Sequence, residues 1–261
     1  MADLTYREAL RRALDDELAR DPDVFLMGEE IGRFEGSYKV TAGLWEKYGP
    51  ERVRETPISE EGFVGAGIGA AMMGLRPVVE IMTINFILVA MDQVINHAAK
   101  IRYMFGGAVG VPMVIRTPGG AGAQLTAQHS QSLEAWFAGC PGMKVVAPAS
   151  VADVLARDGI EVEVVDLRSL RPLDAETVIE SVRKTNRALV AEEGWATYGV
   201  GAELAARIHR ACFDDLDAPV ERVGGAEVPM PYSKPVELAA LPLEAKIEAA
   251  ARELLGESGM L

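Results

Sequence analysis

Short apolar runs alternate with segments of helical character along most of this chain. The runs are rich in Val, Ile, Leu and Met, and they lie at 24–27, 77–81, 112–115, 144–147, 162–165 and 188–191. The helical segments lie between them, at 61–73, 86–103, 130–138, 175–183 and 201–211. Strands that alternate with helices predict an α/β protein with mostly parallel sheets. Ligands bind beyond the carboxyl ends of such strands, so the loops there are where a site is expected.

The composition is that of a folded globular protein rather than a disordered one, with 49% hydrophobic and 25% charged residues. A length of 261 residues suits two ordinary domains or one large one. The formal net charge is −13, which makes binding to nucleic acid or to an anionic membrane by bulk electrostatics a poor expectation. The sequence also lacks a cluster of positive charge that could hold a diphosphate.

Two cysteines, Cys140 and Cys212, lie far apart and form no C-x-x-C pair. A disulfide framework and a structural zinc site are therefore not expected, which fits a reducing compartment. The N-terminal residues show no targeting leader, and the longest apolar stretch, 81–91, is too short to span a bilayer. These features predict a cytoplasmic protein with no membrane segment.

The segment 56–63 joins a strand-like piece to a glycine-rich helix. One interpretation is structural: Ser59 caps the helix, and Glu60 and Glu61 in its first turn interact favourably with the helix dipole. The other is functional: a carboxylate at a strand-to-helix corner exchanges a proton with a ligand. The glycines of 65–69 do not follow the G-x-G-x-x-G order of dinucleotide sites, so they predict close packing against another helix or a subunit interface.

A second glycine-rich segment, 118–123, follows an apolar run and leads to His129. A mobile loop that carries a histidine to a helix start is typical of an active site, where that histidine acts as an acid near neutral pH. The alternative is a solvated loop histidine. His97 and His209 fall within helical segments and are expected to be structural, and the three histidines are too scattered to predict a metal site. P-loop and nucleophile-elbow motifs are absent.

Taken together, these motifs resemble the β subunits of the E1 component of 2-oxo acid dehydrogenase complexes, and the pyruvate dehydrogenase branch in particular. The stretches that carry the resemblance run nearly from end to end of the chain, at 28–30, 36–40, 56–63, 80–86, 92–96, 127–131, 166–172 and 228–232. The resemblance implies two α/β domains with parallel sheets. The first is a thiamine-diphosphate-binding domain of the pyrimidine type at 1–153, and the second is of the transketolase C-terminal type at 154–261.

Glu60 matches the glutamate that hydrogen-bonds N1′ of the thiamine diphosphate aminopyrimidine and favours its imino tautomer. The spacing of Glu60, Gly65 and Gly69 fits the family's E-x4-G-Φ-x-x-G pattern, where Φ is apolar, although Ala66 is small for the Φ position. The resemblance therefore implies that Glu60 is both a catalytic and a cofactor-binding residue.

The resemblance assigns further positions to the site. Ile58, Met82 and Phe86 match residues that wall the pyrimidine, where a dry apolar wall strengthens the glutamate hydrogen bond. His129 matches the catalytic histidine that serves acyl transfer to a lipoyl group. Glu30 matches an acidic position near the cofactor.

The family also implies cofactors and partners. Thiamine diphosphate acts with Mg²⁺, and the α subunit of an α2β2 heterotetramer holds the diphosphate and the metal, so no metal ligand is expected in this chain. The C-terminal domain docks the E2 acyltransferase, and pyruvate and the lipoyl group are the substrates. A branched-chain 2-oxo acid or acetoin enzyme remains an alternative, whereas a single-chain enzyme of the transketolase kind is disfavoured because the diphosphate-binding half is missing.

The chain departs from the family pattern at 148–160. A stretch of barely two helical turns joins two predicted strands there, close to the shortest length a parallel crossover allows. The resemblance implies that several tens of residues are missing here, including a family site for potassium and strands of both sheets, which leaves both domains incomplete. Either the gap arises from how the sequence was recorded, or the chain is a truncated, non-catalytic β-like protein that binds partners.

Overall fold

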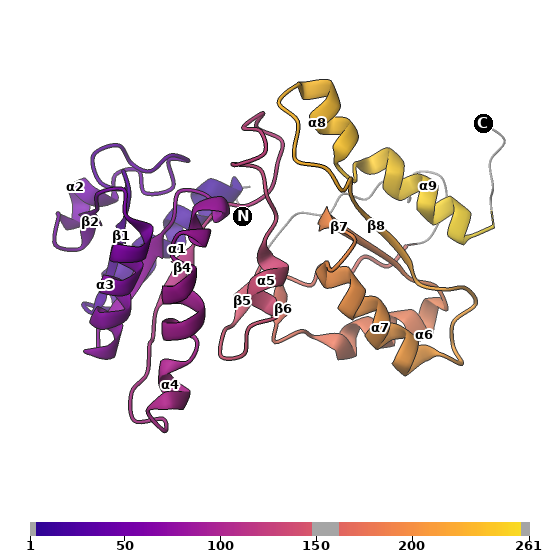
Figure 1. The fold of residues 1–261 in the computed structure, drawn as a ribbon, viewed down its shortest axis with the longest axis horizontal. Coiled ribbons are helices and arrows are strands. Elements are labelled where there is room, and N and C mark those ends of the chain that lie inside the picture. Colours follow the sequence, from indigo (N-terminus) through magenta and orange to yellow (C-terminus); the bar gives the residue numbers. More distant parts are fainter. Residues whose placement is uncertain (1–3, 148–161, 257–261) are drawn as a thin grey trace. The chain divides into compact units, whose positions relative to one another are not determined.

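The computed structural model describes residues 4–147 and 162–256, and these fall into two compact units that divide between Gly119 and Gly120 (Figure 1). The predicted deletion at 148–160 and the predicted domain boundary between residues 153 and 154 lie outside the described residues. That boundary therefore stays a prediction. Residues 120–147, which precede the boundary, belong to the second compact unit.

A parallel four-stranded sheet forms the centre of the first unit. Its strands are β1 (Val24–Gly28), β2 (Val53–Glu55), β3 (Arg76–Glu80) and β4 (Val114–Arg116), in the order β2-β1-β3-β4. All three pairings are parallel, and they confirm the strands expected at 24–27, 77–81 and 112–115. Every residue of β1 is buried, so its uninterrupted apolar sequence reflects a strand covered on both faces.

Three α-helices of this unit are α1 (Tyr6–Arg20), α2 (Leu44–Tyr48) and α3 (Glu60–Met72). A capping box at Thr5 and Glu8 starts α1, with each side chain bonded to the other residue's backbone N–H. Leu18 of α1 packs with Val24, Leu26 and Val53 of the sheet in one buried cluster. This core fixes the sheet and hence the position of its carboxyl edge.

The helix expected at 86–103 is divided into three short pieces. They are a 3-10 helix, η1 (Ile84–Leu88), a π-helical segment, η2 (Gln93–Ala98), and α4 (Ile101–Met104). Polar side chains compete for backbone and carboxylate oxygens at the start of η2: Asn96 donates to Asp92 Oδ1 at 2.8 Å, and His97 Nδ1 lies 3.3 Å from the Asp92 carbonyl oxygen. Such local bonds offer the backbone an alternative to regular helix.

The second unit contains helices α5 (Glu134–Ala138), α6 (Ala175–Thr185), α7 (Val200–Cys212), α8 (Lys234–Ala240) and α9 (Glu244–Leu254). Its strands β7 (Leu189–Trp195) and β8 (Glu221–Gly225) pair in parallel. Both α7 and α9 contact these two strands, and Figure 1 shows them on opposite sides of the pair. Val178, Leu204, Ile208 and Val220 are among the buried residues of its core.

Two expected features of this unit are corrected by the structure. Strand β5 (Val145–Val146) pairs with β6 (Ser169–Arg171) in an antiparallel manner, so it extends neither parallel sheet. Residues 162–165 form no strand, although Val165 packs against the core of the unit. An extended segment becomes a strand only where a neighbour accepts and donates its backbone bonds, and none does so within the described residues. The helix expected at 130–138 begins at Glu134.

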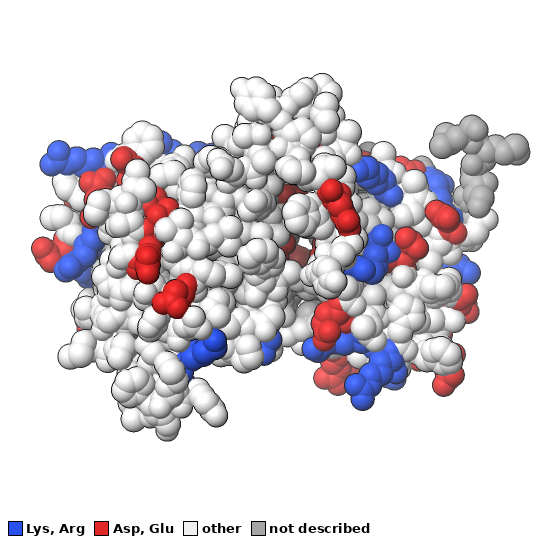
Figure 2. Space-filling view, in the orientation of Figure 1, with Lys and Arg blue, Asp and Glu red and all other residues white. Residues whose placement is uncertain are grey.

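On the face of the molecule shown in Figure 2, Lys and Arg side chains lie among Asp and Glu side chains. In residues 4–147 and 162–256, no helix is long and apolar enough to cross a membrane.

Candidate functional site

The carboxyl ends of β1, β2 and β3 meet at one edge of the first sheet. Gly28 is in register with both Glu55 and Glu80, and the backbone N–H of Thr56 donates to the Gly28 carbonyl oxygen at 3.0 Å. A Cβ atom on Gly28 would lie 2.4 Å from the Glu80 carbonyl oxygen, so this close approach requires glycine. The segments that follow these strands carry most of the predicted site residues.

Glu60 is the first residue of α3, and only 5% of its surface is exposed, whereas its neighbour Glu61 is exposed. The sequence favoured Ser59 as a side-chain cap, but the Ser59 hydroxyl instead donates to the Pro57 carbonyl oxygen at 3.2 Å. A carboxylate this well buried is costly unless a partner bonds it. The burial of Glu60 therefore favours the functional interpretation over a solvated helix start.

Two glycines hold α3 close to its neighbours and so fix the position of Glu60. A Cβ atom on Gly67 would lie 2.9 Å from Val79 Cγ2 of β3, and one on Gly65 would lie 3.2 Å from Gln93 Oε1 of η2. The predicted close packing against another helix is thus found at Gly65, while Gly67 faces the sheet. These small residues let the helix lie directly on β3.

Glu29 is a second buried carboxylate, 4% exposed, and the sequence analysis did not select it. Burial and, to a smaller extent, the nearby charge of Glu60 together raise the pKa of Glu29 to about 7, against the opposing effect of a backbone hydrogen bond from Ser59. Two carboxyl groups that are held close together and shielded from water are more stable when one of them keeps its proton. Its position directly after a wholly buried strand was the signal in the sequence that could have identified it.

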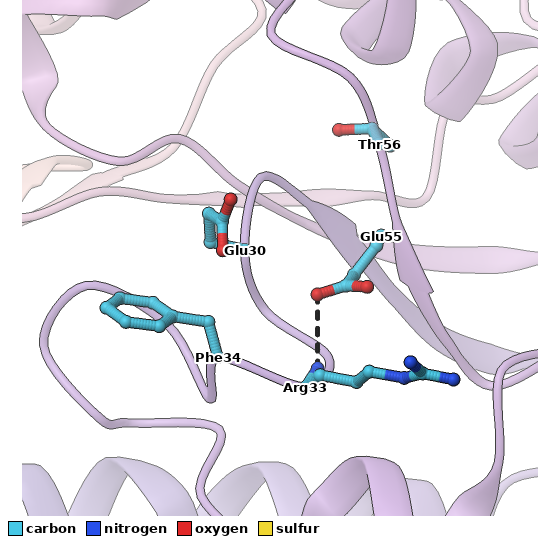
Figure 3. Close-up of a pocket in the computed structure, with 5 residues that line it drawn as sticks. All are labelled: Glu30, Arg33, Phe34, Glu55 and Thr56. Carbon is cyan, nitrogen blue, oxygen red and sulfur yellow. Dashed lines mark hydrogen bonds between the residues drawn. The ribbon is translucent and has the colours of Figure 1, made fainter.

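Glu30, the acidic residue that the resemblance selected, occupies a different environment. It is exposed, has a backbone φ of 57°, and lines a shallow hollow with Arg33, Phe34, Glu55 and Thr56 (Figure 3). The Arg33 backbone N–H donates to Glu55 Oε1 at 3.1 Å in this hollow. A role for Glu30 beside the cofactor stays a prediction, while Glu29 is the acidic residue whose charge interacts with Glu60.

The three residues expected to wall the pyrimidine all follow strands at this edge. Ile58 lies between β2 and α3, Met82 follows β3, and Phe86 lies in η1. Met82 and Phe86 are half-buried, whereas the Ile58 side chain is 82% exposed in this chain. Whether they contact the cofactor stays a prediction.

His129 belongs to the second compact unit, in the glycine-rich loop at 119–131. It is half-buried, and its backbone N–H donates to the Thr126 carbonyl oxygen at 3.2 Å. His209, by contrast, is structural as expected: its Nδ1 lies 2.9 Å from the Ala205 carbonyl oxygen, and its Nε2 accepts the Val220 N–H at 3.3 Å.

The carboxyl edge fits the aminopyrimidine of a thiamine cofactor. Glu29 Oε1 and Thr56 Oγ1 are buried oxygens that find no hydrogen-bond partner among the described residues. Orphaned buried oxygens beside a buried glutamate suit a ligand that brings its own donors. Within the same described residues, no group of three or more His, Cys, Asp or Glu side chains is placed to hold a metal ion.

The raised pKa of Glu29 predicts a pH dependence of stability. Between its usual value of 4.5 and about 7, the folded chain keeps a proton that the unfolded chain has released, so stability falls as the pH rises. Glu29→Gln has no titrating group at this position. The difference in free energy of unfolding between this variant and the wild type should therefore grow in favour of the variant as the pH rises from 4.5 to about 7, and stay constant at higher pH. Urea unfolding of both proteins at a series of pH values measures the difference. A difference that stays constant with pH would contradict the assignment.

Comparisons with known proteins agree with this geometry. Residues 2–157 match the family model "Transketolase, pyrimidine binding domain", and residues 140–247 match "Transketolase, C-terminal domain". The chain is 42% identical to a pyruvate dehydrogenase E1 component subunit beta-1, mitochondrial, of Oryza sativa subsp. japonica, over 96% of this chain and 86% of that protein. It is 40% identical to the pyruvate dehydrogenase E1 component subunit beta of Rickettsia felis, over 96% of this chain and 98% of that protein.

The chain belongs to the family of pyruvate dehydrogenase E1 β subunits. A solved structure described as "Split gene transketolase, inactive beta4 tetramer" shares the fold of this family member, with a TM-score of 0.71 and 18% identity over 97% of this chain and 98% of that one. The alignment with the rice E1 β subunit runs over 322 positions, 61 more than the 261 residues here, so at least 61 of its positions have no counterpart in this chain.

Proposed function

We propose that this chain, assembled with an α subunit as an α2β2 heterotetramer, decarboxylates pyruvate and reductively acetylates the lipoyl group of E2, whose disulfide takes up the two electrons. Thiamine diphosphate is the cofactor, with its diphosphate and Mg²⁺ held by the α subunit. The observation that carries the proposal is the buried Glu60 carboxylate at the start of α3, whose charge acts on a second buried carboxyl group, that of Glu29. Family membership supplies the reaction class.

The chemistry divides between cofactor and protein. Thiamine diphosphate supplies an electron sink for the charge that remains when the 2-oxo acid loses carbon dioxide. Glu60 bonds the aminopyrimidine and sets its tautomer. Glu29, with its pKa near 7, keeps a proton available beside Glu60 at physiological pH. The half-buried Met82 and Phe86 side chains exclude water from the pyrimidine and so strengthen the Glu60 bond.

Reconstitution tests this proposal. The purified chain is combined with the α subunit, thiamine diphosphate and Mg²⁺, and carbon dioxide release is compared for pyruvate and branched-chain 2-oxo acids, alongside acetoin oxidation. We expect turnover with pyruvate to exceed that with the others. Preference for a branched-chain acid or for acetoin would reassign the substrate, and failure with all three in an assembled heterotetramer would contradict the proposal.

A second candidate is a non-catalytic, β-like partner-binding chain. It is favoured by the 61 or more positions of the rice relative without counterpart here, and by a second unit whose parallel sheet has two strands among the described residues. The intact mass of the purified chain is the first measurement that separates these candidates, because a mass near 28.0 kDa would show that the deletion is real. Assembly with the α subunit and cofactor binding by that same species would then favour the enzyme.

Other parts of the proposal concern location and partners. We place the protein in the cytoplasm, because both cysteines are free and buried, as suits a reducing compartment. Its relatives include mitochondrial proteins of rice and Drosophila melanogaster as well as a bacterial one, so fractionation of the source cells is the test. We also infer that the C-terminal domain docks E2, which binding of E2 to the heterotetramer would check.

A further inference from the structure

The loop that carries His129 has a constrained backbone. Gly120 and Gly122 have φ values of 89° and 100°, which glycine adopts without steric cost. Gln124 and Thr126 have φ values of 56° and 61°, a region that residues with a Cβ atom avoid and that is especially unfavourable for β-branched threonine. Such conformations persist only where surrounding contacts hold them, and they often mark functional segments.

A fully buried carboxylate holds the middle of this loop. Glu237 of α8 has no exposed surface, and its Oε1 accepts the backbone N–H groups of Gly122 at 3.2 Å and Gln124 at 2.9 Å. Lys234, one turn earlier on α8, donates to the Gly122 carbonyl oxygen at 2.8 Å and lies 3.4 Å from Glu237 Oε2. Glu237 and Lys234, from one turn of α8, therefore bond the backbone N–H and the carbonyl oxygen of the same loop residue, Gly122.

The ends of the loop have separate supports. Glu193 Oε1 of β7 accepts the Ala121 N–H at 2.7 Å and the Ser132 hydroxyl at 3.3 Å. The Thr126 hydroxyl lies 3.4 Å from the Met230 carbonyl oxygen, which it can reach as a weak donor. His129 lies three residues further on, with its own N–H bonded to the Thr126 carbonyl oxygen. The loop between the Glu237 clamp and His129 is thus bonded at Gly122, Gln124 and Thr126.

Burying Glu237 is costly unless its charge is compensated, and the loop amides and Lys234 supply that compensation. Charge-assisted bonds of this kind are stronger and more directional than neutral ones. The sequence places the carboxylate 108 residues beyond His129, on a helix that the proposed mechanism does not otherwise use. If the side chain at this position only had to fill space, an apolar residue would serve. A buried carboxylate there indicates that the loop it bonds must be held in one geometry.

We propose that Glu237 is a positioning residue for His129: by clamping Gly122 and Gln124 it sets the loop geometry from which the histidine serves acyl transfer to the lipoyl group. The inference rests on the proposed function, because it concerns the second half of that reaction. It predicts that loss of the clamp impairs acyl transfer selectively, since Glu60 and the decarboxylation site lie in the other unit.

Glu237→Gln in the reconstituted α2β2 enzyme tests the inference, with Glu244→Gln as the matched control because Glu244 is exposed at the start of α9. Hydrogen exchange of the 119–131 peptide reports the clamp directly, and should quicken in Glu237→Gln alone. Acetyl transfer to lipoyl E2 should fall about tenfold, and at most about a hundredfold, in kcat, as expected for a misplaced catalytic group. Pyruvate decarboxylation, followed with an artificial electron acceptor, should stay at the wild-type rate.

Three results would overturn the inference: unchanged hydrogen exchange, unchanged acetyl transfer, or an equal fall of both half-reactions, which would indicate a merely structural role. If Glu237→Gln does not fold, Lys234→Met replaces it, because Lys234 bonds the Gly122 carbonyl oxygen and lies 3.4 Å from Glu237 Oε2 in the same clamp. The same selective loss is then expected. Absence of both half-reactions in the wild type would refute the proposed function and the inference with it, whereas a wild-type-like variant of an active enzyme refutes the inference alone.

Discussion

Glu60→Gln should lower pyruvate decarboxylation by the reconstituted enzyme by about a hundredfold to ten-thousandfold, the range typical of losing a general acid–base group. Glutamine has nearly the same shape, so α3 and its packing should be preserved. Its amide is neutral and cannot hold the proton that a carboxylate shares with the aminopyrimidine. The steady-state rate of carbon dioxide release at saturating pyruvate and cofactor measures the effect.

Glu61→Gln is the matched control for this substitution. It makes the same chemical change one residue later, at an exposed position in the same helical turn. We expect it to keep the wild-type rate, because its side chain lies in water. Equal rates for both variants and the wild type would show that Glu60 is buried for structural reasons alone.

His129→Asn should abolish most of the acetyl transfer to lipoyl E2, also by about a hundredfold to ten-thousandfold, while decarboxylation followed with an artificial electron acceptor is largely retained. Asparagine can accept and donate hydrogen bonds but cannot carry a proton near neutral pH, which is the property that acyl transfer requires of the histidine. Reductive acetylation of E2 at saturating pyruvate is the measurement.

His97→Asn serves as its control. That histidine lies in η2 of the first unit, and its contact with Asp92 is local. The control should behave as the wild type in both assays. If His129→Asn slowed decarboxylation as much as acetyl transfer, the histidine would act before the acyl group is formed, and its assignment to lipoyl transfer would be wrong.

Features encoded by neighbouring residues were predictable from the sequence. The T-x-x-E pattern of Thr5 and Glu8 is visible in the sequence and forms the capping box that starts α1, because both hydrogen bonds join residues three apart. The apolar runs at 24–27 and 77–81 form β1 and β3, because strands buried on both faces require such runs. The resemblance of the ordered motifs to E1 β subunits was likewise confirmed, since those motifs are local too.

Features that depend on partners distant in the sequence could not be predicted. The sequence could not show that β5 pairs antiparallel with β6, because pairing depends on which strands are within reach. Nor could it show that Glu29 is buried and affected by the charge of Glu60 while Glu30 is exposed, since one residue's difference along the chain exchanges a buried side for an exposed one.

The sequence by itself therefore determined the α/β class, the family and the segments that carry Glu60 and His129. Only the tertiary structure showed which carboxylates are buried. It also showed that the charge of Glu60 raises the pKa of Glu29, and that Glu237 bonds the loop that carries His129. The physical reason is that secondary-structure propensity and motif spacing act over a few residues. Desolvation and charge interactions instead depend on every group that folding brings within a few ångströms.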